Sequence, residues 1–230
     1  MKIDKVLLQQ NKKVVILGGG TGLSQILKGL KLFPVDVTAV VTVADNGRST
    51  GKLRSELNIP AVGDISKVLL SMANVNKDVK ELMNYRFKGD TTLESHSIKN
   101  LILAALLDIK GDFKNSIPVL IDLLDIKGNV LPITEENVQL VGITNDGREV
   151  VGEEEITYDA AKIEKIKYNR PIEITPEVRK AIKDADLIIF SSGSLLTSLS
   201  PNLVACTLLV ENKIRQIVNN KRNGFLWLTD

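Results

Sequence analysis

The stretch Val14-Val15-Ile16-Leu17-Gly18-Gly19-Gly20-Thr21-Gly22-Leu23-Ser24 decides how the chain is expected to fold. Its first four residues are apolar and three of them are β-branched, which predicts a buried strand. The glycines then turn the chain, and from Leu23 the apolar residues recur at helical spacing. A strand, a glycine turn and a helix together point backbone N–H groups and the positive end of a helix dipole at an anion. We therefore expect a phosphate cradle at this turn.

The glycine turn matches neither of two standard phosphate-binding motifs. The dinucleotide fingerprint would need glycine at position 23, where this chain has leucine. The segment from Gly47 to Lys52 approaches a P-loop, but it is one residue short and lacks the Ser or Thr that should follow. The alternative is a glycine-rich turn that only packs the strand against the helix. We prefer a phosphate cradle of a non-standard kind.

The composition is that of an ordinary globular protein, and we expect a single α/β domain over residues 1–230. With 30 basic and 28 acidic residues, the chain gives no reason to expect a nucleic acid or an anionic membrane as a partner. We see no signal peptide and no apolar run long enough to span a membrane, so we expect a cytoplasmic protein. The single cysteine, Cys206, lies in an apolar run, which predicts a buried thiol.

A second β-branched run, residues 37–43, leads into Asp45 and Asn46. With the intervening helix it completes a β-α-β unit whose two strands should be parallel. Asp45 then falls at the carboxyl end of a strand, on the edge where open parallel sheets bind ligands. It could bind a sugar hydroxyl, hold a metal or act as a base; the alternative is a carboxylate satisfied within its own turn. Residues 45–52 are expected to form a polar loop.

Three further polar residues are candidates for the site. Asp64 precedes a run with helical spacing, so it is expected to cap that helix, to serve the site, or both. His96, the only histidine, begins an alanine- and leucine-rich helix predicted over 97–107 and lies beside Asn100. Ligand contact and a structural role are both open for it, and a zinc site is not expected.

From about residue 129 to 170 the pattern changes to short strands. The runs at 130–133, 138–144 and 149–152, with a hairpin turn at Asn145-Asp146-Gly147, predict a small β-rich insertion rather than a separate domain. Residues 153–155, three consecutive glutamates, are interpreted as a solvated edge that discourages strand pairing.

Leu187-Ile188-Ile189-Phe190 returns to the pattern of a buried parallel strand, after a helix that Pro176 opens. A second hydroxyl-rich strand-to-helix turn follows at residues 191–198. If both turns lie at one edge of one sheet, their amides and hydroxyls form a two-part phosphate site. This pair of turns is more specific than either turn alone.

Together these motifs resemble the gluconeogenesis factor family, whose relatives include 2-phospho-L-lactate transferase. The matches follow the family's order from residue 13 to about 215. The matching segments are Gly18-Gly19-Gly20-Thr21-Gly22-Leu23-Ser24, Thr42-Val43-Ala44-Asp45, Gly51-Lys52-Leu53-Arg54, Gly63-Asp64-Ile65, Tyr85-Arg86-Phe87, His96, Asn100-Leu101, Val130-Leu131-Pro132, Gly152-Glu153, Gly193-Ser194-Leu195, Thr197-Ser198 and Pro201-Asn202-Leu203.

The resemblance implies a Rossmann-like three-layer α/β/α sandwich with a mostly parallel sheet. It also implies a nucleotide diphosphate ligand, with UDP-sugars the best attested in the family. The transferase relatives join a phospholactyl group to a deazaflavin alcohol with Mg²⁺, whereas the gluconeogenesis factors are associated with cell shape and cell-wall precursor supply. Family chains are longer, and residues 225–230 look like the start of the next core strand, so the C-terminal part of the family fold is expected to be absent from this chain.

The chain departs from the family pattern mainly at the site. Ser66 and Lys67 stand where the family has Arg-Asn, and Ser191-Ser192 precede Gly193-Ser194 where it has Gly-Pro. Arg48, Ser95 and Lys99 each stand where it has glycine. A lysine at a helix start narrows the space for a ligand and also adds a cation.

Three functions are therefore open. The first is a regulatory protein that binds a UDP-sugar, and the second is a Mg²⁺-dependent transferase in which Asp45 and Asp64 hold the metal. The third is an inactive relative that only docks another protein. Whether the chain forms a homo-oligomer is left open. The ligand-binding candidates are Gly19, Gly20, Thr21, Gly22, Asp45, Asn46, Ser192, Gly193, Ser194, Thr197 and Asn202, and the catalytic candidates are Asp45, Asp64, His96 and Asn100.

Overall fold

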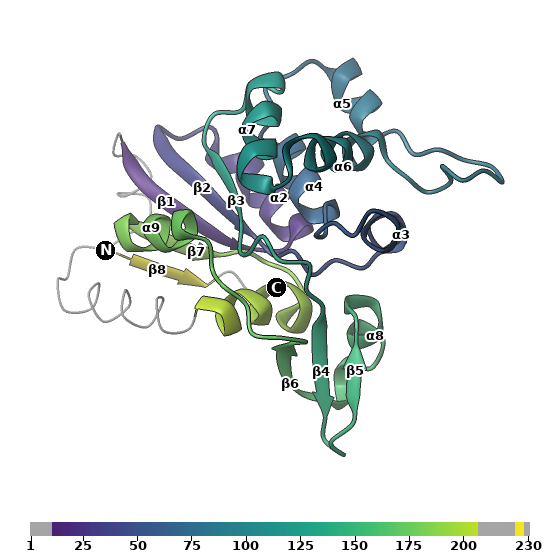
Figure 1. Ribbon diagram of the computed structural model, residues 1–230. Coiled ribbons are helices and arrows are strands. Elements are labelled where there is room, and N and C mark those ends of the chain that lie inside the picture. The colour runs from purple at the N-terminus through teal and green to yellow at the C-terminus, as the bar shows by residue number, and fades with distance from the viewer. Residues whose placement is uncertain (1–10, 207–223, 228–230) are drawn as a thin grey trace.

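A parallel β-sheet forms the centre of the computed structural model, which describes residues 11–206 and 224–227 (Figure 1). Its strand order is β3-β2-β1-β7-β8, and each neighbouring pair is parallel. Val14 to Leu17 in the central strand are buried on both faces, as their uninterrupted apolar run predicts. The strands are β1 (Lys12–Gly18), β2 (Val35–Val41), β3 (Asn129–Pro132), β7 (Leu187–Phe190) and β8 (Gly224–Trp227).

Helices cover both faces of this sheet, which confirms the predicted Rossmann-like α/β/α sandwich. Figure 1 shows α2, α4, α6 and α7 on one side and α9 on the other. None of the helices formed by the described residues has the length and apolarity needed to cross a bilayer. The helices are α2 (Gly20–Leu30), α3 (Arg48–Leu57), α4 (Gly63–Met72), α5 (Lys77–Asn84), α6 (Ile98–Lys110), α7 (Phe113–Leu123), α8 (Glu153–Tyr158) and α9 (Pro176–Asp184), with short turns η1 (Ala160–Lys162) and η2 (Leu195–Leu199).

The β-rich segment predicted over 129–170 divides between two sheets. Its first run is β3, which pairs in parallel with β2 at the edge of the main sheet, so the predicted start of the insertion was wrong. A short apolar run looks the same in a parallel edge strand and in a hairpin strand, which explains the error. The remainder forms an antiparallel sheet, and its predicted hairpin is confirmed between β4 and β5. That sheet has the order β5-β4-β6, from β4 (Leu140–Thr144), β5 (Glu149–Val151) and β6 (Ile163–Tyr168).

The carboxyl ends of the central strands lie level with one another. Gly18 at the end of β1 is in register with Val41, and Leu17 is in register with Phe190 at the end of β7. The chain leaves β1 toward β2 on one side and later returns to β7 on the other. This is the reversal of strand order at which open α/β sheets form a ligand-binding crevice.

Candidate functional site

A cavity of about 940 Å³ opens at this carboxyl edge of the sheet. Four helices of ten to thirteen residues begin at its wall and contribute residues of their first turns. Because the start of a helix carries unpaired N–H groups and partial positive charge, all four favour an anion in the cavity. These first-turn residues are Thr21 of α2, Ser49 and Thr50 of α3, Gly63 and Asp64 of α4, and Lys99 and Asn100 of α6.

Four cationic side chains, Lys67, Arg86, Lys88 and Lys99, also line the cavity. Lys67 donates to the hydroxyl of Thr21 at 2.7 Å, and Lys99 donates to the side-chain oxygen of Asn84 at 2.9 Å. Burial, together with the charges of Arg86 and Lys67, lowers the pKa of Lys99 to about 8. These neighbouring cations repel one another, and an anion in the cavity would relieve that repulsion.

Five acidic residues line the same cavity: Asp45, Asp64, Glu94, Glu153 and Glu154. Burial and the charge of Asp45 raise the pKa of Asp64 to about 6, against smaller opposing effects of Gly20, Lys67 and Thr42. Burial and the charges of Asp64 and Asp45 raise the pKa of Glu153 to about 7. The cavity is thus lined by cations and by mutually repelling carboxylates, so it suits a ligand with both phosphate and hydroxyl groups or one that brings a metal ion.

Asp64 occupies the anion position that the sequence suggested for a phosphate. Its carboxylate accepts the backbone N–H of Gly20, and a Cβ at Gly20 would overlap the Asp64 carboxyl group. Asp64 is not the cap of its helix, because α4 already begins at Gly63 and its preceding residue, Val62, makes no side-chain capping bond. The predicted capping role was therefore wrong. The glycine turn does hold an anion, and that anion belongs to the chain itself.

Asp45 satisfies much of its hydrogen-bonding capacity within its own turn. Its two oxygens accept the N–H of Gly47 and the hydroxyl of Thr50, both at 2.8 Å. The carboxylate still lines the cavity. The polar loop predicted over 45–52 is wrong in its second half, because α3 begins at Arg48; the side chain of Arg48 lies outside the described part of the chain.

His96 and Asn100 belong to a buried chain of hydrogen bonds behind the cavity wall. Nδ1 of His96 lies 3.1 Å from Oγ of Ser49, and Asn100 donates to the same Oγ at 3.1 Å. Ser66 in turn donates to Asn100 at 2.6 Å. Asn100 lines the cavity, whereas His96 is buried beside it, and this burial lowers its pKa. The chain of bonds ties together the first turns of α3, α4 and α6.

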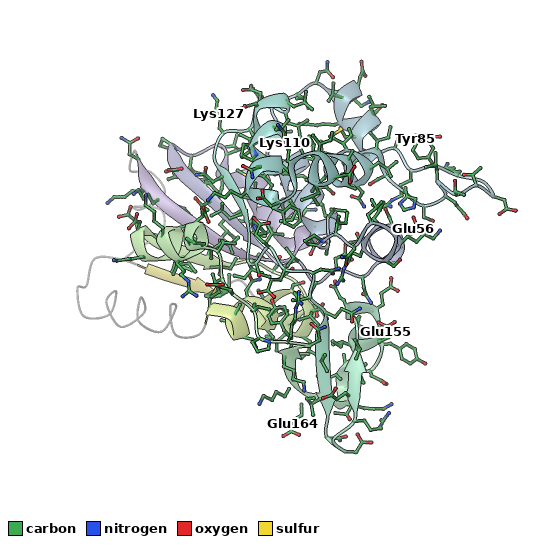
Figure 2. All side chains as sticks on the ribbon, in the orientation of Figure 1. Glu56, Tyr85, Lys110, Lys127, Glu155 and Glu164 are labelled. Atoms are coloured by element: carbon green, nitrogen blue, oxygen red, sulfur yellow. The ribbon has the colours of Figure 1, made fainter. Side chains whose placement is uncertain are left out.

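Asn46 holds the start of α8, which brings Glu153 to the cavity. The side-chain oxygen of Asn46 accepts the N–H groups of Glu153 and Glu154 at 3.0 and 3.1 Å, and its amide donates to Glu155 at 3.1 Å. Figure 2 shows Glu155 on α8. The predicted solvated edge at 153–155 was wrong, because these residues form a helical turn whose first member is partly buried. Reasoning from single residues missed Glu153.

The two glycine- and hydroxyl-rich turns lie against each other, as predicted. A Cβ at Gly22 would overlap the carbonyl oxygen of Ser192, and one at Gly19 would lie 2.8 Å from Oγ of Ser198. Ser194 accepts the N–H of Thr197 at 3.2 Å, and Thr197 also bonds to the carboxylate of Glu153. Asn202 is fully buried and donates to the carbonyl of Ser198 at 2.9 Å. The 940 Å³ cavity is not lined by any of the five ligand-binding candidates of the second turn and the helix after it, Ser192, Gly193, Ser194, Thr197 and Asn202. Among these five, Thr197 alone is connected to the cavity wall, through its bond to Glu153.

Cys206 is buried, as predicted, and burial raises the pKa of its thiol to about 12. It is therefore protonated near neutral pH and is no nucleophile. Across residues 11–206 and 224–227, no three His, Cys, Asp or Glu side chains are grouped closely enough to hold a metal ion by themselves.

These features define an α/β protein with a Rossmann-like sheet and an anion-suited cavity at the carboxyl edge of that sheet. A family model described as 2-phospho-L-lactate transferase CofD matches residues 14–222, so the chain belongs to that family.

Its relatives include the "Putative gluconeogenesis factor" of Thermotoga maritima and the gluconeogenesis factor of Bacillus subtilis. The first is 47% identical over 193 residues, which is 84% of this chain and 61% of the relative. The second is 45% identical over 196 residues, 85% of this chain and 62% of the relative. A crystal structure of a UPF0052-family protein from Bacillus halodurans aligns with a TM-score of 0.84 and 40% identity, over 90% of this chain and 66% of that one. The chain thus spans about six tenths of the length of the curated relatives it matches.

Proposed function

We propose that this protein binds a nucleotide diphosphate ligand of the UDP-sugar type and acts as a regulatory protein in cytoplasmic cell-wall precursor metabolism, with effects on cell shape. The observation that carries the binding proposal is the convergence of four helix N-termini and four cationic side chains on one cavity. Its volume is within the range of about 300–1,000 Å³ that small-molecule sites occupy. The regulatory part of the proposal rests on the resemblance to the gluconeogenesis factors, the name that the relatives carry.

The diphosphate is assigned to the end of the cavity formed by Lys67, Lys99 and the start of α2. Lys99 is held in place by Asn84, and Lys67 by Thr21, so both ammonium groups are positioned before a ligand arrives. The hydroxyls of Ser49 and Thr50 and the amide of Asn100 also line the cavity. Such groups are suited to the hydroxyl and carbonyl oxygens of a sugar or a base.

Isothermal titration with UDP-N-acetylglucosamine tests the proposal, with a matched pair of lysine variants in α6. Lys99 lies in the first turn and in the cavity, whereas Lys110 lies in the last turn and is exposed. Because a charge-assisted hydrogen bond contributes about 1.5–3 kcal/mol, Lys99→Gln should weaken binding by about tenfold or more. Lys110→Gln should leave binding within about twofold. Absence of measurable affinity for the UDP-sugar in the unmodified protein would refute the proposal.

A second candidate, a Mg²⁺-dependent transferase, is favoured by the paired carboxylates. Asp45 and Asp64 both line the cavity, and the charge of Asp45 contributes to the raised pKa of Asp64, a repulsion that a cation relieves. Two carboxylates fit Mg²⁺, which commonly takes its other ligands from phosphates and water. A bound Mg²⁺ would neutralise charge on the phosphate oxygens. The chain's own residues would hold the metal and place the phosphate against the helix N-termini.

Asp45→Asn separates the two candidates. In the transferase, this change should abolish the Mg²⁺ dependence of ligand binding and lower turnover by at least about a hundredfold, because it removes a metal ligand. In a binding protein without metal chemistry, the unmodified protein should already bind the UDP-sugar equally well with Mg²⁺ or with EDTA, and the variant should do the same. Turnover that is unaffected by the change would exclude the transferase with this metal site.

A further inference from the structure

A second cavity, of about 450 Å³, lies between α2, α4 and α5, next to the first. Four lysines line it: Lys28, Lys31, Lys67 and Lys80. The hydroxyls of Thr21 and Ser24 lie on the same wall. The surface here therefore combines four positive charges with hydrogen-bond donors, in a hollow large enough for a small molecule.

This cavity differs from the first in its acidic residues. No Asp or Glu among the described residues lines it, although the chain as a whole has 28 of them. The acidic residues of α5 are Asp78 and Glu81, and Glu81 pairs with Lys77 at 3.3 Å on the exposed face of that helix. Within the described part of the chain, Lys28, Lys31 and Lys80 have no ion-pair partner. Among the described residues no carboxylate neutralises these charges, and none lines the cavity to hold a divalent cation.

We propose that the second cavity is a binding site for a small, multiply phosphorylated metabolite, held without a metal ion. Lysine ammonium groups bind phosphate oxygens as point charges with three donors each, and several converging lysines favour a ligand with more than one phosphoryl group. The first cavity, with its five carboxylates, suits a metal-bound diphosphate, whereas the second suits a polyanion without a metal ion. The proposal for this second site does not depend on what the first cavity binds.

Two hydrogen-bonded pairs join the cavities. Lys67 and Thr21 line both cavities, and Asn84, on the wall of the second, accepts from Lys99 on the wall of the first. If the first cavity binds a diphosphate as proposed above, two anions compete for the ammonium group of Lys67. Each ligand should then weaken the other, and by the same factor, because coupling between two binding sites is reciprocal.

Titration calorimetry with pyrophosphate in EDTA tests the second site. The unmodified protein should bind pyrophosphate, and the triple variant Lys28→Gln/Lys31→Gln/Lys80→Gln should bind it at least about tenfold more weakly. The control removes three charges elsewhere, with Lys110→Gln/Lys127→Gln/Lys165→Gln, and should stay within about twofold. Figure 2 shows Lys110 and Lys127 near α7, and neither lysine lines the second cavity. Lys80→Gln alone, at a half-buried position on the helix surface, should weaken binding about threefold, and this single change controls for misfolding of the triple variant.

Three outcomes would overturn the proposal: no binding of pyrophosphate in EDTA, equal weakening of binding in both triple variants, or loss of binding in Lys99→Gln alone, which would place the pyrophosphate in the first cavity.

The coupling between the two cavities is tested separately, by titrating UDP-N-acetylglucosamine with and without saturating pyrophosphate. Antagonism that disappears in the Lys28/Lys31/Lys80 variant supports coupling through the second site. Antagonism that persists there indicates direct competition in the first cavity and contradicts the coupling. If the UDP-sugar does not bind, the proposed function and the coupling are both refuted. The proposal for the second site is then still decided by the pyrophosphate titration alone.

Discussion

At Gly20, an N–H group that could bind a ligand's phosphate is bonded to the carboxylate of Asp64. This contact explains why the chain has glycine there, because any Cβ would collide with Asp64. It also makes Asp64 sensitive to whatever enters the cavity. A ligand phosphate that takes over the Gly20 N–H would release the Asp64 carboxylate, and a metal ion would stabilise the released charge.

Ser95, in the cavity wall, is a second residue at which backbone geometry matters. It has a φ of 71°, in the left-handed region that favours glycine. The resemblance to the gluconeogenesis factors predicts glycine at this position, and the structure supplies the conformational reason. Serine therefore places a hydroxyl in the wall at some cost in backbone strain.

The raised pKa of Glu153 predicts a pH-dependent stability. Its folded-state pKa of about 7 lies above the ordinary 4.5, so the folded protein binds a proton more tightly than the unfolded chain. This contribution is fully present below the ordinary pKa and is lost as the pH rises through about 7. One pKa unit corresponds to about 1.4 kcal/mol, and 1 kcal/mol shifts the Tm of a chain this size by about 2–4 °C. Glu153→Gln should therefore raise the Tm at pH 7.5 by at least about 3 °C.

Thermal unfolding in EDTA at pH 4.0 and pH 7.5 measures this effect. At pH 4.0 Glu153 is protonated in the folded protein and largely protonated in the unfolded chain, so the glutamine variant should melt within about 1 °C of the unmodified protein. Glu154→Gln, at the exposed neighbouring position, is the control and should change little at either pH. An equal rise of Tm at both pH values would show that the effect has nothing to do with protonation.

At the scale of the elements, β1 and α2 were predictable because their signals are local. The apolar run of β1, the glycines and the helical spacing from Leu23 follow one another directly along the chain. The parallel strand β7 and the hairpin between β4 and β5 were predictable for the same reason. The place of β3 in the parallel sheet was not predictable, because a run of four apolar residues does not indicate which strand it pairs with.

The candidate site was less predictable than the elements around it. Its contacts join residues far apart in sequence: Asn46 caps α8 across 107 positions, and Asp64 meets Gly20 after a crossover. Single-sequence reasoning therefore placed Asp45 at the right edge of the sheet and named Asp64 and Asn100 as candidates for the site, but it did not identify Glu153. Only the resemblance pointed to Gly152-Glu153. Lys67 and Lys99 were noted as departures from the family, and the structure places both in the cavity wall.

The fit between α2 and the second turn predicts opposite effects for two glycines of one helix. At Gly22 a Cβ would overlap the main-chain carbonyl of Ser192, and backbone cannot move aside easily. We expect Gly22→Ala to lower the free energy of unfolding by about 2 kcal/mol or more. At Gly29, where no described atom lies within 4 Å of the added Cβ, alanine should raise it by about 0.5–1 kcal/mol because of its better helix propensity. Urea unfolding measures both, and similar stability of the two variants would contradict the close approach of the two turns.

At the scale of the whole molecule, Arg54 joins the antiparallel sheet to the rest of the protein. From α3, its guanidinium donates to the side-chain oxygen of Asn137 at 2.8 and 3.1 Å, and to the carbonyls of Val138 and Asp45 at 2.7 and 3.1 Å. Asn137 and Val138 lead directly into β4, and Asp45 lines the cavity. One buried side chain thus holds the entry to the second sheet against the turn that carries a candidate metal ligand.

Arg54→Lys tests this connection, because lysine keeps the charge but cannot reach three separated acceptors with one ammonium group. The buried acceptors left without a donor should lower the free energy of unfolding by about 2–3 kcal/mol. Arg148→Lys is the control: Arg148 pairs with Asp146 at 2.8 Å in the exposed β4–β5 hairpin, so its loss should stay within about 0.5 kcal/mol. Hydrogen exchange should also become faster in β4 and β6 of the Arg54 variant, while β1 keeps its protection. If exchange increases equally in both sheets, Arg54 supports the fold in general and is no specific link between its two parts.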